Sequence, residues 1–350
     1  MSMVSTTTVM AQIGEATNRT LVLPIVMFAP THRCNSACVS CAWWSTTSGA
    51  GVAEHSELTL SEIDRVAADL ARLGTRLVVF TGGEPLLRPD VFDAARAFHR
   101  RGIRLHLLTS GLGLDPRVAS VAELFERVIV SLDGNTRERY AEIRGVDGFE
   151  SVAAGVAHLR RFAPTLTVSA RSTIHQRNFR QLSALVDTAR AMGVGSISFL
   201  AADLRSAAFG ARDLDALQSL RLSPDEVSEF RQVIEQVIDV HARDFASGFI
   251  AESPAKLRQL AQYYAAVNGD GRFPPKACNA PWMSAVIEAN GDLRPCFFHP
   301  VVGNVRRDGV ITVARKALPR FRASLDVATN AVCERCVCSL KVGWLDQPWA

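Results

Sequence analysis

Eight cysteines fall into three groups along a chain of 350 residues. None lies between the first group and the second. In a reducing compartment, grouped cysteines hold metal more often than they form disulfides. The sequence therefore predicts two metal sites, built from opposite ends of the chain. The groups are Cys34, Cys38 and Cys41; Cys278 and Cys296; and Cys333, Cys336 and Cys338.

The first group places three thiols within eight residues, with no fourth cysteine nearby. An iron–sulfur cube needs four ligands, so three protein thiolates would leave one iron open to another molecule. The alternative is a closed zinc site completed by His32, since structural zinc takes four protein ligands. The spacing alone leaves both sites open.

The segments around this group predict a strand, a helix and a second strand. The apolar run 25–29 is typical of a buried strand, which puts the cysteines on the loop at its carboxyl end. Residues 59–62 form a capping box that opens a helix ending at Gly74. The next strand, 76–80, leads into the Thr-Gly-Gly-Glu-Pro segment 81–85. Paired glycines let a backbone approach a ligand closely, and a carboxylate can accept hydrogen bonds from an ammonium group.

The pairing of C-x3-C-x2-C with Gly-Gly-Glu-Pro resembles the radical SAM superfamily. In that family a 4Fe-4S cluster binds the amino and carboxylate groups of S-adenosylmethionine (SAM) through its open iron. The residue before the third cysteine is usually aromatic, whereas here it is Ser40, and Trp43 or Trp44 is the candidate replacement against the adenine. The resemblance implies that Cys34, Cys38 and Cys41 hold the cluster, and that Gly82, Gly83 and Glu84 bind the SAM amine.

Strand-like and helix-like segments alternate with short connections between about residues 23 and 201. This rhythm predicts an α/β fold with a parallel sheet, and the resemblance implies a partial (β/α)6 barrel. Ligands in such folds gather at the carboxyl ends of the strands. The six predicted strands are 25–29, 76–80, 104–109, 128–132, 166–172 and 196–200.

Three side chains near the ends of these strands are candidates for SAM binding. The family places hydroxyls equivalent to Thr109 and Ser131 against the ribose or carboxylate of SAM, and Arg171 could pair with the carboxylate. An ordinary turn at the end of a strand is the alternative for both hydroxyls. The dipeptide at 144–145 also matches the family, and we expect it to serve loop geometry.

The alternation stops after residue 201, where a helical connector is predicted. Serine, proline and glutamate at 223–226 mark the start of a helix running to about residue 243. A second helix is predicted from 253 to about 269.

The C-terminal cysteines form the second predicted site. Asn290-Gly291 is a strong hairpin signal, and a hairpin there would bring Cys278 close to Cys296. From spacing alone, a zinc ribbon and an iron–sulfur cluster are comparable. Beside a radical SAM core, however, the segment resembles the SPASM/twitch extensions. Five cysteines follow residue 277, which suffices for one auxiliary 4Fe-4S cluster and not for the two of a full SPASM domain. The preferred ligands are Cys278, Cys296, Cys333 and Cys336, with Cys338 as an alternative ligand or a free thiol.

The predicted organisation has four parts: an N-terminal extension (1–22), the radical SAM barrel (23–201), the helical connector (202–277) and a twitch-like auxiliary-cluster domain (278–350). No segment is long and apolar enough to cross a bilayer, and the N-terminus is unlike a signal peptide, so a cytoplasmic protein is expected. The formal charge of +4 is scattered along the chain, which argues against nucleic acid as a partner.

The resemblance implies an oxidoreductase that reductively cleaves SAM to a 5′-deoxyadenosyl radical and takes hydrogen from a small biosynthetic substrate. The auxiliary cluster would assist a net oxidation or rearrangement, and a flavodoxin or ferredoxin would donate electrons. One alternative is a maturase of a ribosomally made peptide, although about two dozen residues before the first strand leave no room for a leader-binding module. The other is a non-catalytic zinc or iron–sulfur protein. No catalytic acid or base can be named from the sequence.

Overall fold

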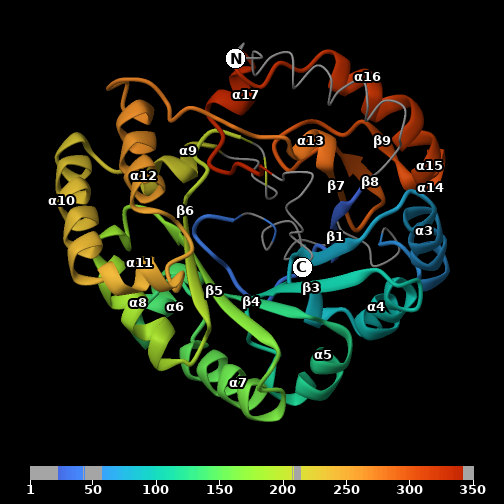
Figure 1. The fold of residues 1–350 in the computed structure, drawn as a ribbon, viewed down its shortest axis with the longest axis horizontal. Coiled ribbons are helices and arrows are strands. Elements are labelled where there is room, and N and C mark those ends of the chain that lie inside the picture. Colours follow the sequence, from blue (N-terminus) through green and yellow to red (C-terminus); the bar gives the residue numbers. More distant parts are fainter. Residues whose placement is uncertain (1–22, 42, 44–56, 207, 209–213, 342–350) are drawn as a thin grey trace, which may run out of the picture.

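The computed structural model describes residues 23–41, 43, 57–206, 208 and 214–341. Its centre is a nine-stranded sheet in the order β6-β5-β4-β3-β2-β1-β7-β8-β9. Figure 1 shows this sheet curving round an inner space, with helices along its outside. The strands are β1 (Ile25–Thr31), β2 (Leu77–Gly82), β3 (Arg104–Thr109), β4 (Arg127–Ser131), β5 (Thr167–Ile174), β6 (Ser196–Ala201), β7 (Ser284–Ile287), β8 (Asp292–Arg294) and β9 (Gly303–Asn304).

Strands β1 to β6 are parallel and follow one another in the sheet, so every connection crosses over through helices. The expected alternating α/β fold and its six strands are confirmed. The helices of this half are α3 (Leu60–Arg72), α4 (Val91–His99), α5 (Val118–Leu124), α6 (Arg137–Arg144), α7 (Phe149–Phe162) and α8 (Leu182–Ala191), with short 3-10 turns at Pro85–Leu87, Asp115–Arg117 and Phe179–Gln181.

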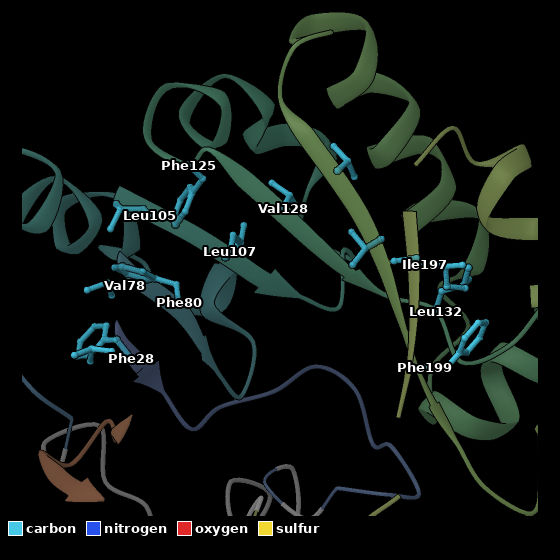
Figure 2. Close-up of a cluster of buried hydrophobic side chains, with 14 of the residues drawn as sticks. Phe28, Val78, Phe80, Leu105, Leu107, Phe125, Val128, Leu132, Ile197 and Phe199 are labelled. Atoms are coloured by element: carbon cyan, nitrogen blue, oxygen red, sulfur yellow. The ribbon is translucent and has the colours of Figure 1, made fainter. Parts of the chain in front are cut away.

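The core lies between the sheet and its outer helices. Phe28 of β1 and Phe80 of β2 are fully buried, and their ring centroids lie 5.4 Å apart in an edge-on arrangement. Figure 2 shows these rings in one row with apolar side chains from the neighbouring strands. Burying each such ring contributes about 1.5–3 kcal/mol. On the alternate positions, Val79 belongs to a smaller cluster that includes Leu340, so the C-terminal segment reaches the opposite face of the sheet.

The connector is helical as predicted, with one break. The first predicted helix ends at Val240, and a second, shorter helix begins after His241. The buried Tyr264 hydroxyl donates a 2.6 Å hydrogen bond to the carbonyl of Ile174, which fixes the connector against the end of β5. The helices are α9 (Leu214–Leu217), α10 (Pro224–Val240), α11 (Ala242–Ser247) and α12 (Pro254–Val267), with a 3-10 turn at Gln218–Leu220.

The C-terminal region continues the barrel sheet. Strand β7 lies parallel to β1 and pairs Ser284 with Ile25. It then turns back through the predicted hairpin, where Gly291 has a φ of 88°, into the antiparallel strand β8. The remaining elements are α13 (Ala280–Met283), α14 (Val305–Asp308), α15 (Val310–Thr312), a π-helical turn (Val313–Ala317), α16 (Leu318–Ala323) and α17 (Ala331–Glu334). No helix in the described ranges is long and apolar enough to cross a membrane.

Candidate functional site

The first cysteine group lies on the loop that follows β1, as the sequence predicts, and this loop rests on helix α6. The amide of Ala37 donates to the carbonyl of Arg144 at 2.9 Å, and the amide of Val39 donates to Ile143 at 3.0 Å. Gly145 caps the helix with a φ of 66°, and a Cβ there would lie 2.5 Å from the Ala37 carbonyl oxygen. Only glycine allows this approach, so the predicted loop role of 144–145 is confirmed and extended to holding the cysteine loop.

The three thiols of this loop are shielded from solvent to different degrees, since Cys38 is buried while Cys34 and Cys41 are half-buried. Burial raises the pKa of Cys38 to about 11, and that of Cys41 to about 12. The charge of Cys34 adds to both increases, so the three sulfurs are electrostatic neighbours. Metal binding must therefore displace protons from them. Three soft sulfur donors on one short loop fit a 4Fe-4S cluster with one open iron.

Beside these thiols lies an ion pair that the sequence did not reveal. Arg144 donates through Nη1 to Asp133 at 2.9 Å, with side chains 12% and 4% exposed. The other carboxylate oxygen of Asp133 accepts the amide of Thr173 at 2.7 Å. Burial lowers the pKa of Arg144, but the negative charges of Cys38 and Asp133 outweigh it and raise that pKa. A guanidinium is thus held next to the cysteine loop, at the end of β4.

The Gly-Gly-Glu segment packs directly against the chain leading into the cysteines. The amide of Gly83 donates to Thr31 at 3.0 Å, and the amide of Glu84 donates to Arg33 at 2.7 Å. A Cβ on Gly83 would lie 2.1 Å from the Arg33 carbonyl oxygen, and one on Gly82 would lie 2.6 Å from the Cβ of Ala29. These glycines are therefore needed to bring the two loops together.

The Glu84 carboxylate is 1% exposed and joins the ends of β2 and β3. Its Oε1 accepts hydrogen bonds from the Leu86 amide at 3.0 Å and the Thr109 hydroxyl at 2.8 Å, while Oε2 accepts from the Ser110 amide at 2.6 Å. The Thr109 hydroxyl also accepts the amide of Gly111. Most of the hydrogen bonds that the Glu84 and Thr109 side chains can make are thus made within the protein. Their contacts with SAM stay predictions.

Ser131 and Arg171 are brought together. They are register partners: Ser131 is the last residue of β4, and Arg171 lies three residues before the end of β5. Ser131 is half-buried, while Arg171 is exposed and donates through Nε to Ser198 at 3.2 Å. Ser131 at the end of its strand, with Arg171 beside it, suits a ligand lying over the barrel, and the roles of both residues toward SAM stay predictions.

All five C-terminal cysteines line one hollow. Burial raises the pKa of Cys333 to about 11, and it also raises that of Cys336. The Cys336 thiol donates to the carbonyl of Cys338 at 3.0 Å. Shared sulfur donors around one hollow fit an auxiliary iron–sulfur cluster, and the choice among five thiols for four positions stays a prediction. The hollow is lined by Lys276, Cys278, Pro281, Cys296, Phe298, His299, Val327, Val332, Cys333, Cys336 and Cys338.

Two family models match the chain. Residues 28–189 match the radical SAM superfamily. The chain contains a radical SAM domain. Residues 278–337 match the iron–sulfur cluster-binding SPASM domain. The radical SAM domain implies a 4Fe-4S cluster and SAM, and the SPASM domain implies auxiliary iron–sulfur clusters. The cysteine loop after β1 and the five C-terminal cysteines fit these cofactors.

Several known proteins are similar to this radical SAM chain. It is 32% identical to the AdoMet-dependent heme synthase of Methanosarcina barkeri over 48% of each chain, so it spans about half the length of that relative. The PqqA peptide cyclase of Ruegeria pomeroyi is 29% identical over 81% of this chain and 70% of the relative. The mycofactocin maturase MftC of Mycobacterium tuberculosis is 26% identical over 92% of this chain and 78% of the relative.

A solved structure shows the same fold. Streptococcus suis SuiB is superposed with a TM-score of 0.65 at 17% identity, over 95% of this chain and 77% of SuiB. At this identity the match shows that the two proteins share a fold.

The histidine in the zinc alternative has other partners. The Nε2 atom of His32 accepts the amide of Ala289 at 3.4 Å, and its ring stacks on Trp43 at 4.1 Å. Trp44, the other candidate for the adenine surface, lies outside the described residues. Within the part of the chain that the structure describes, no three His, Cys, Asp or Glu groups are arranged to hold a single metal ion.

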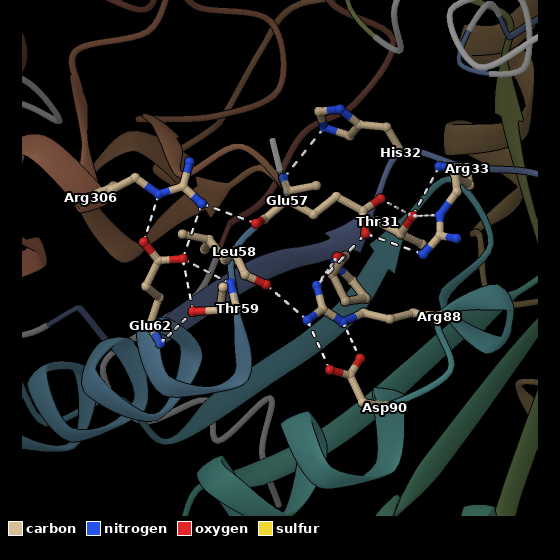
Figure 3. A network of polar contacts seen from close by, with 12 residues as sticks. Thr31, His32, Arg33, Glu57, Leu58, Thr59, Glu62, Arg88, Asp90 and Arg306 are labelled. Carbon is tan, nitrogen blue, oxygen red and sulfur yellow. Dashed lines mark hydrogen bonds and ion pairs between the residues drawn. The ribbon is translucent and has the colours of Figure 1, made fainter. Parts of the chain in front are cut away.

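A polar network missed by sequence reasoning braces the chain before the cysteines (Figure 3). Arg88 donates 2.8 Å hydrogen bonds to the carbonyls of Pro30 and Leu58 and pairs with Asp90. The Thr31 hydroxyl, in turn, donates to Glu57. No short motif in the sequence predicts such a network, because its residues come from segments that are brought together only by the fold.

Proposed function

We propose that this protein is a radical SAM oxidoreductase that reductively cleaves SAM and takes a hydrogen atom from a biosynthetic substrate. The observation that carries the proposal is a convergence of segments. The cysteine loop after β1, the Gly-Gly-Glu turn after β2, and the ends of β4 and β5 lie at the same edge of the barrel. At that edge a SAM molecule could touch the open iron and the strand ends together.

Each group of residues has its own task in this proposal. Three thiolates hold the SAM-binding cluster, and the Gly-Gly-Glu segment, Ser131, Thr109 and Arg171 hold SAM. When bound, the reduced cluster would supply one electron for the cleavage of SAM, and this cleavage would supply the radical chemistry that takes a hydrogen atom from the substrate. The barrel orients the substrate and excludes water. The ligands and binding residues are Cys34, Cys38, Cys41, Gly82, Gly83, Glu84, Thr109, Ser131 and Arg171.

The C-terminal hollow is proposed to hold one auxiliary 4Fe-4S cluster, with Cys278, Cys296, Cys333 and Cys336 as ligands and Cys338 as the alternative. Removing a hydrogen atom leaves one unpaired electron on the substrate. Net oxidation requires that electron to leave together with a proton, and an auxiliary cluster is the acceptor we propose. We also propose the division into a barrel at 23–201, a connector at 202–277 and an auxiliary domain at 278–350.

A second candidate is maturation of a ribosomally made peptide. Two relatives that align over most of this chain are named a peptide cyclase and a maturase. Their names support a peptide substrate more strongly than the sequence of this chain does by itself. The radical chemistry and both cluster sites would be the same, and the substrate would differ. A small biosynthetic molecule and a peptide are therefore distinguished by turnover, not by cofactor content.

Anaerobic reconstitution tests the shared part of the proposal. Two 4Fe-4S clusters predict about eight irons per chain. Dithionite and SAM should then yield 5′-deoxyadenosine, and Cys38→Ala should abolish that product. Cys336→Ala should spare SAM cleavage and lower substrate conversion. Zinc in place of iron, or a protein that leaves SAM intact, would contradict the enzyme proposal. A flavodoxin or ferredoxin should replace dithionite as the electron donor.

A further inference from the structure

His299 faces a proposed ligand of the auxiliary cluster. Its Nε2 atom lies 3.3 Å from the sulfur of Cys333, and its side chain is 3% exposed. The two residues come from different segments, since His299 follows β8 and Cys333 lies in α17. Both also line the hollow shared by the five cysteines. The contact is therefore part of the wall around the proposed cluster.

The direction of the imidazole is fixed by its surroundings and not by the sulfur alone. Arg294 donates through Nη1 to the His299 carbonyl at 3.0 Å, and the His299 amide donates to Cys296 at 3.4 Å. The ring packs edge-on against Phe321 of α16, with centroids 4.9 Å apart. A ring held by its backbone and by a neighbouring aromatic ring keeps its Nε2 atom aimed at the sulfur.

We propose that His299 is a positioning residue of the auxiliary cluster, with its Nε2–H donating a hydrogen bond to the Cys333 thiolate. This inference rests on the proposed function, because it requires a cluster in the hollow. A cluster-bound cysteine sulfur carries no proton, so the imidazole must be the donor. Five cysteines already supply enough sulfur for four ligand positions, so the imidazole is not needed as a ligand.

The hydrogen bond should favour the reduced cluster. Reduction adds one negative charge that is shared by the sulfurs, and an N–H donor stabilises a charged acceptor more than a less charged one. Hydrogen bonds to the sulfurs are among the factors that set iron–sulfur potentials. His299 would thus make the auxiliary cluster a better acceptor of the electron left on the substrate.

The test uses the full-length chain with Cys34, Cys38 and Cys41 changed to Ala, which leaves only the auxiliary cluster. In this background, His299→Leu removes the donor and His299→Gln keeps an N–H. Val327→Ala is the control, because it alters the apolar lining of the same hollow and leaves the hydrogen bond in place. The readout is a redox titration followed by electron paramagnetic resonance. His299→Leu should lower the ratio of reduced to oxidised cluster about tenfold at a fixed potential, which is about 59 mV for one electron. His299→Gln should recover most of the ratio, and Val327→Ala should stay within about twofold.

Several results would overturn the inference. An unchanged potential in an iron-loaded His299→Leu protein would remove the tuning role. Loss of iron from that variant alone would make His299 a ligand or a structural residue. The unmutated histidine gives an independent check: pulsed resonance on 15N-histidine-labelled protein should show a weakly coupled nitrogen, while strong coupling or none contradicts a hydrogen bond. If the background chain binds no iron at all, the proposed auxiliary cluster fails first, and the inference fails with it.

Discussion

Arg144 and Asp133 form a largely buried ion pair of 2.9 Å at the point where the cysteine loop rests on α6. The backbone of Arg144 accepts the Ala37 amide, while its side chain neutralises Asp133 at the end of β4. One residue therefore joins the loop, the helix and the barrel. Its Nε atom is buried and has no hydrogen-bond partner among the described residues, so the guanidinium has a donor to spare beside the thiols.

Breaking this pair should destabilise the protein strongly. Arg144→Gln would leave the Asp133 carboxylate buried without its partner, which typically costs about 3–5 kcal/mol. Chemical denaturation of the metal-free chain would measure the loss. Arg137→Gln is the matched control, because Arg137 lies on the same helix and its ion pair with Asp147 is exposed, so its loss should lower the stability far less. Equal effects of the two substitutions would show that the buried charge of Asp133 does not matter.

Thr109 and Ser131 should respond differently to loss of their hydroxyls. Thr109→Val removes a buried donor from the Glu84 carboxylate and should cost about 1–3 kcal/mol of unfolding free energy. Ser131→Ala removes a half-buried hydroxyl and should change stability by less than about 0.5 kcal/mol.

SAM affinity completes this comparison. If Ser131 contacts the cofactor, Ser131→Ala should weaken SAM binding about fivefold or more, in line with about 1 kcal/mol for one hydrogen bond. Equilibrium binding to the reconstituted protein measures this directly. If Ser131→Ala binds SAM as tightly as the wild-type protein does, the hydroxyl does not contact SAM and serves only the turn at the end of β4.

Gly83 should tolerate no side chain. In Gly83→Ala the new Cβ would lie 2.1 Å from the Arg33 carbonyl oxygen, so the Gly-Gly-Glu turn must move away from the segment entering the cysteine loop. We expect a loss of about 3 kcal/mol or more in stability, together with poor cluster loading. Gly193→Ala is the control, because a Cβ there would meet no atom within 4 Å, while its φ of 76° is positive, so this substitution adds backbone strain without a clash. It should cost only about 1–2 kcal/mol of backbone strain.

Local sequence patterns predicted the parts of this molecule that depend on neighbouring residues. The cysteine loop at the end of β1 and the hairpin at Asn290-Gly291 lie where strand patterning and turn chemistry put them. Helix α6 was missed because it is short and polar, with Tyr140 and Ile143 as its buried residues. Without that helix, the support under the cysteine loop could not be foreseen.

Long-range pairings were beyond the reach of those patterns. The parallel pairing of β7 with β1 joins the auxiliary region to the barrel sheet, although the two strands are far apart in the chain. The same holds for His299, whose partner Cys333 comes from another segment. A single histidine near a cysteine gives no signal, because the contact depends on how the C-terminal helices pack.

The ion pair between Glu62 of α3 and Arg306 of α14 should make the docking of the C-terminal region sensitive to acid. Hydrogen bonds from Arg306 lower the pKa of Glu62 to about 2, although burial opposes them. Because the folded pKa is below the usual value of 4.5, the stabilisation is complete above about pH 4.5 and is lost as the pH falls toward 2. The side chains are 16% and 38% exposed, so solvent screening limits the contribution to about 1 kcal/mol at neutral pH.

Glu62→Gln should therefore lower the free energy of unfolding by about 1 kcal/mol at pH 7, and the difference from wild type should shrink steadily below pH 4.5. Asp64→Asn is the control on the same helix, since Asp64 pairs with Arg101 of the barrel and not with the C-terminal region. Hydrogen exchange of α14 amides should accelerate in Glu62→Gln and stay unchanged in Asp64→Asn. A difference that persisted at pH 2 would mean that Glu62 acts through its shape and not through its charge.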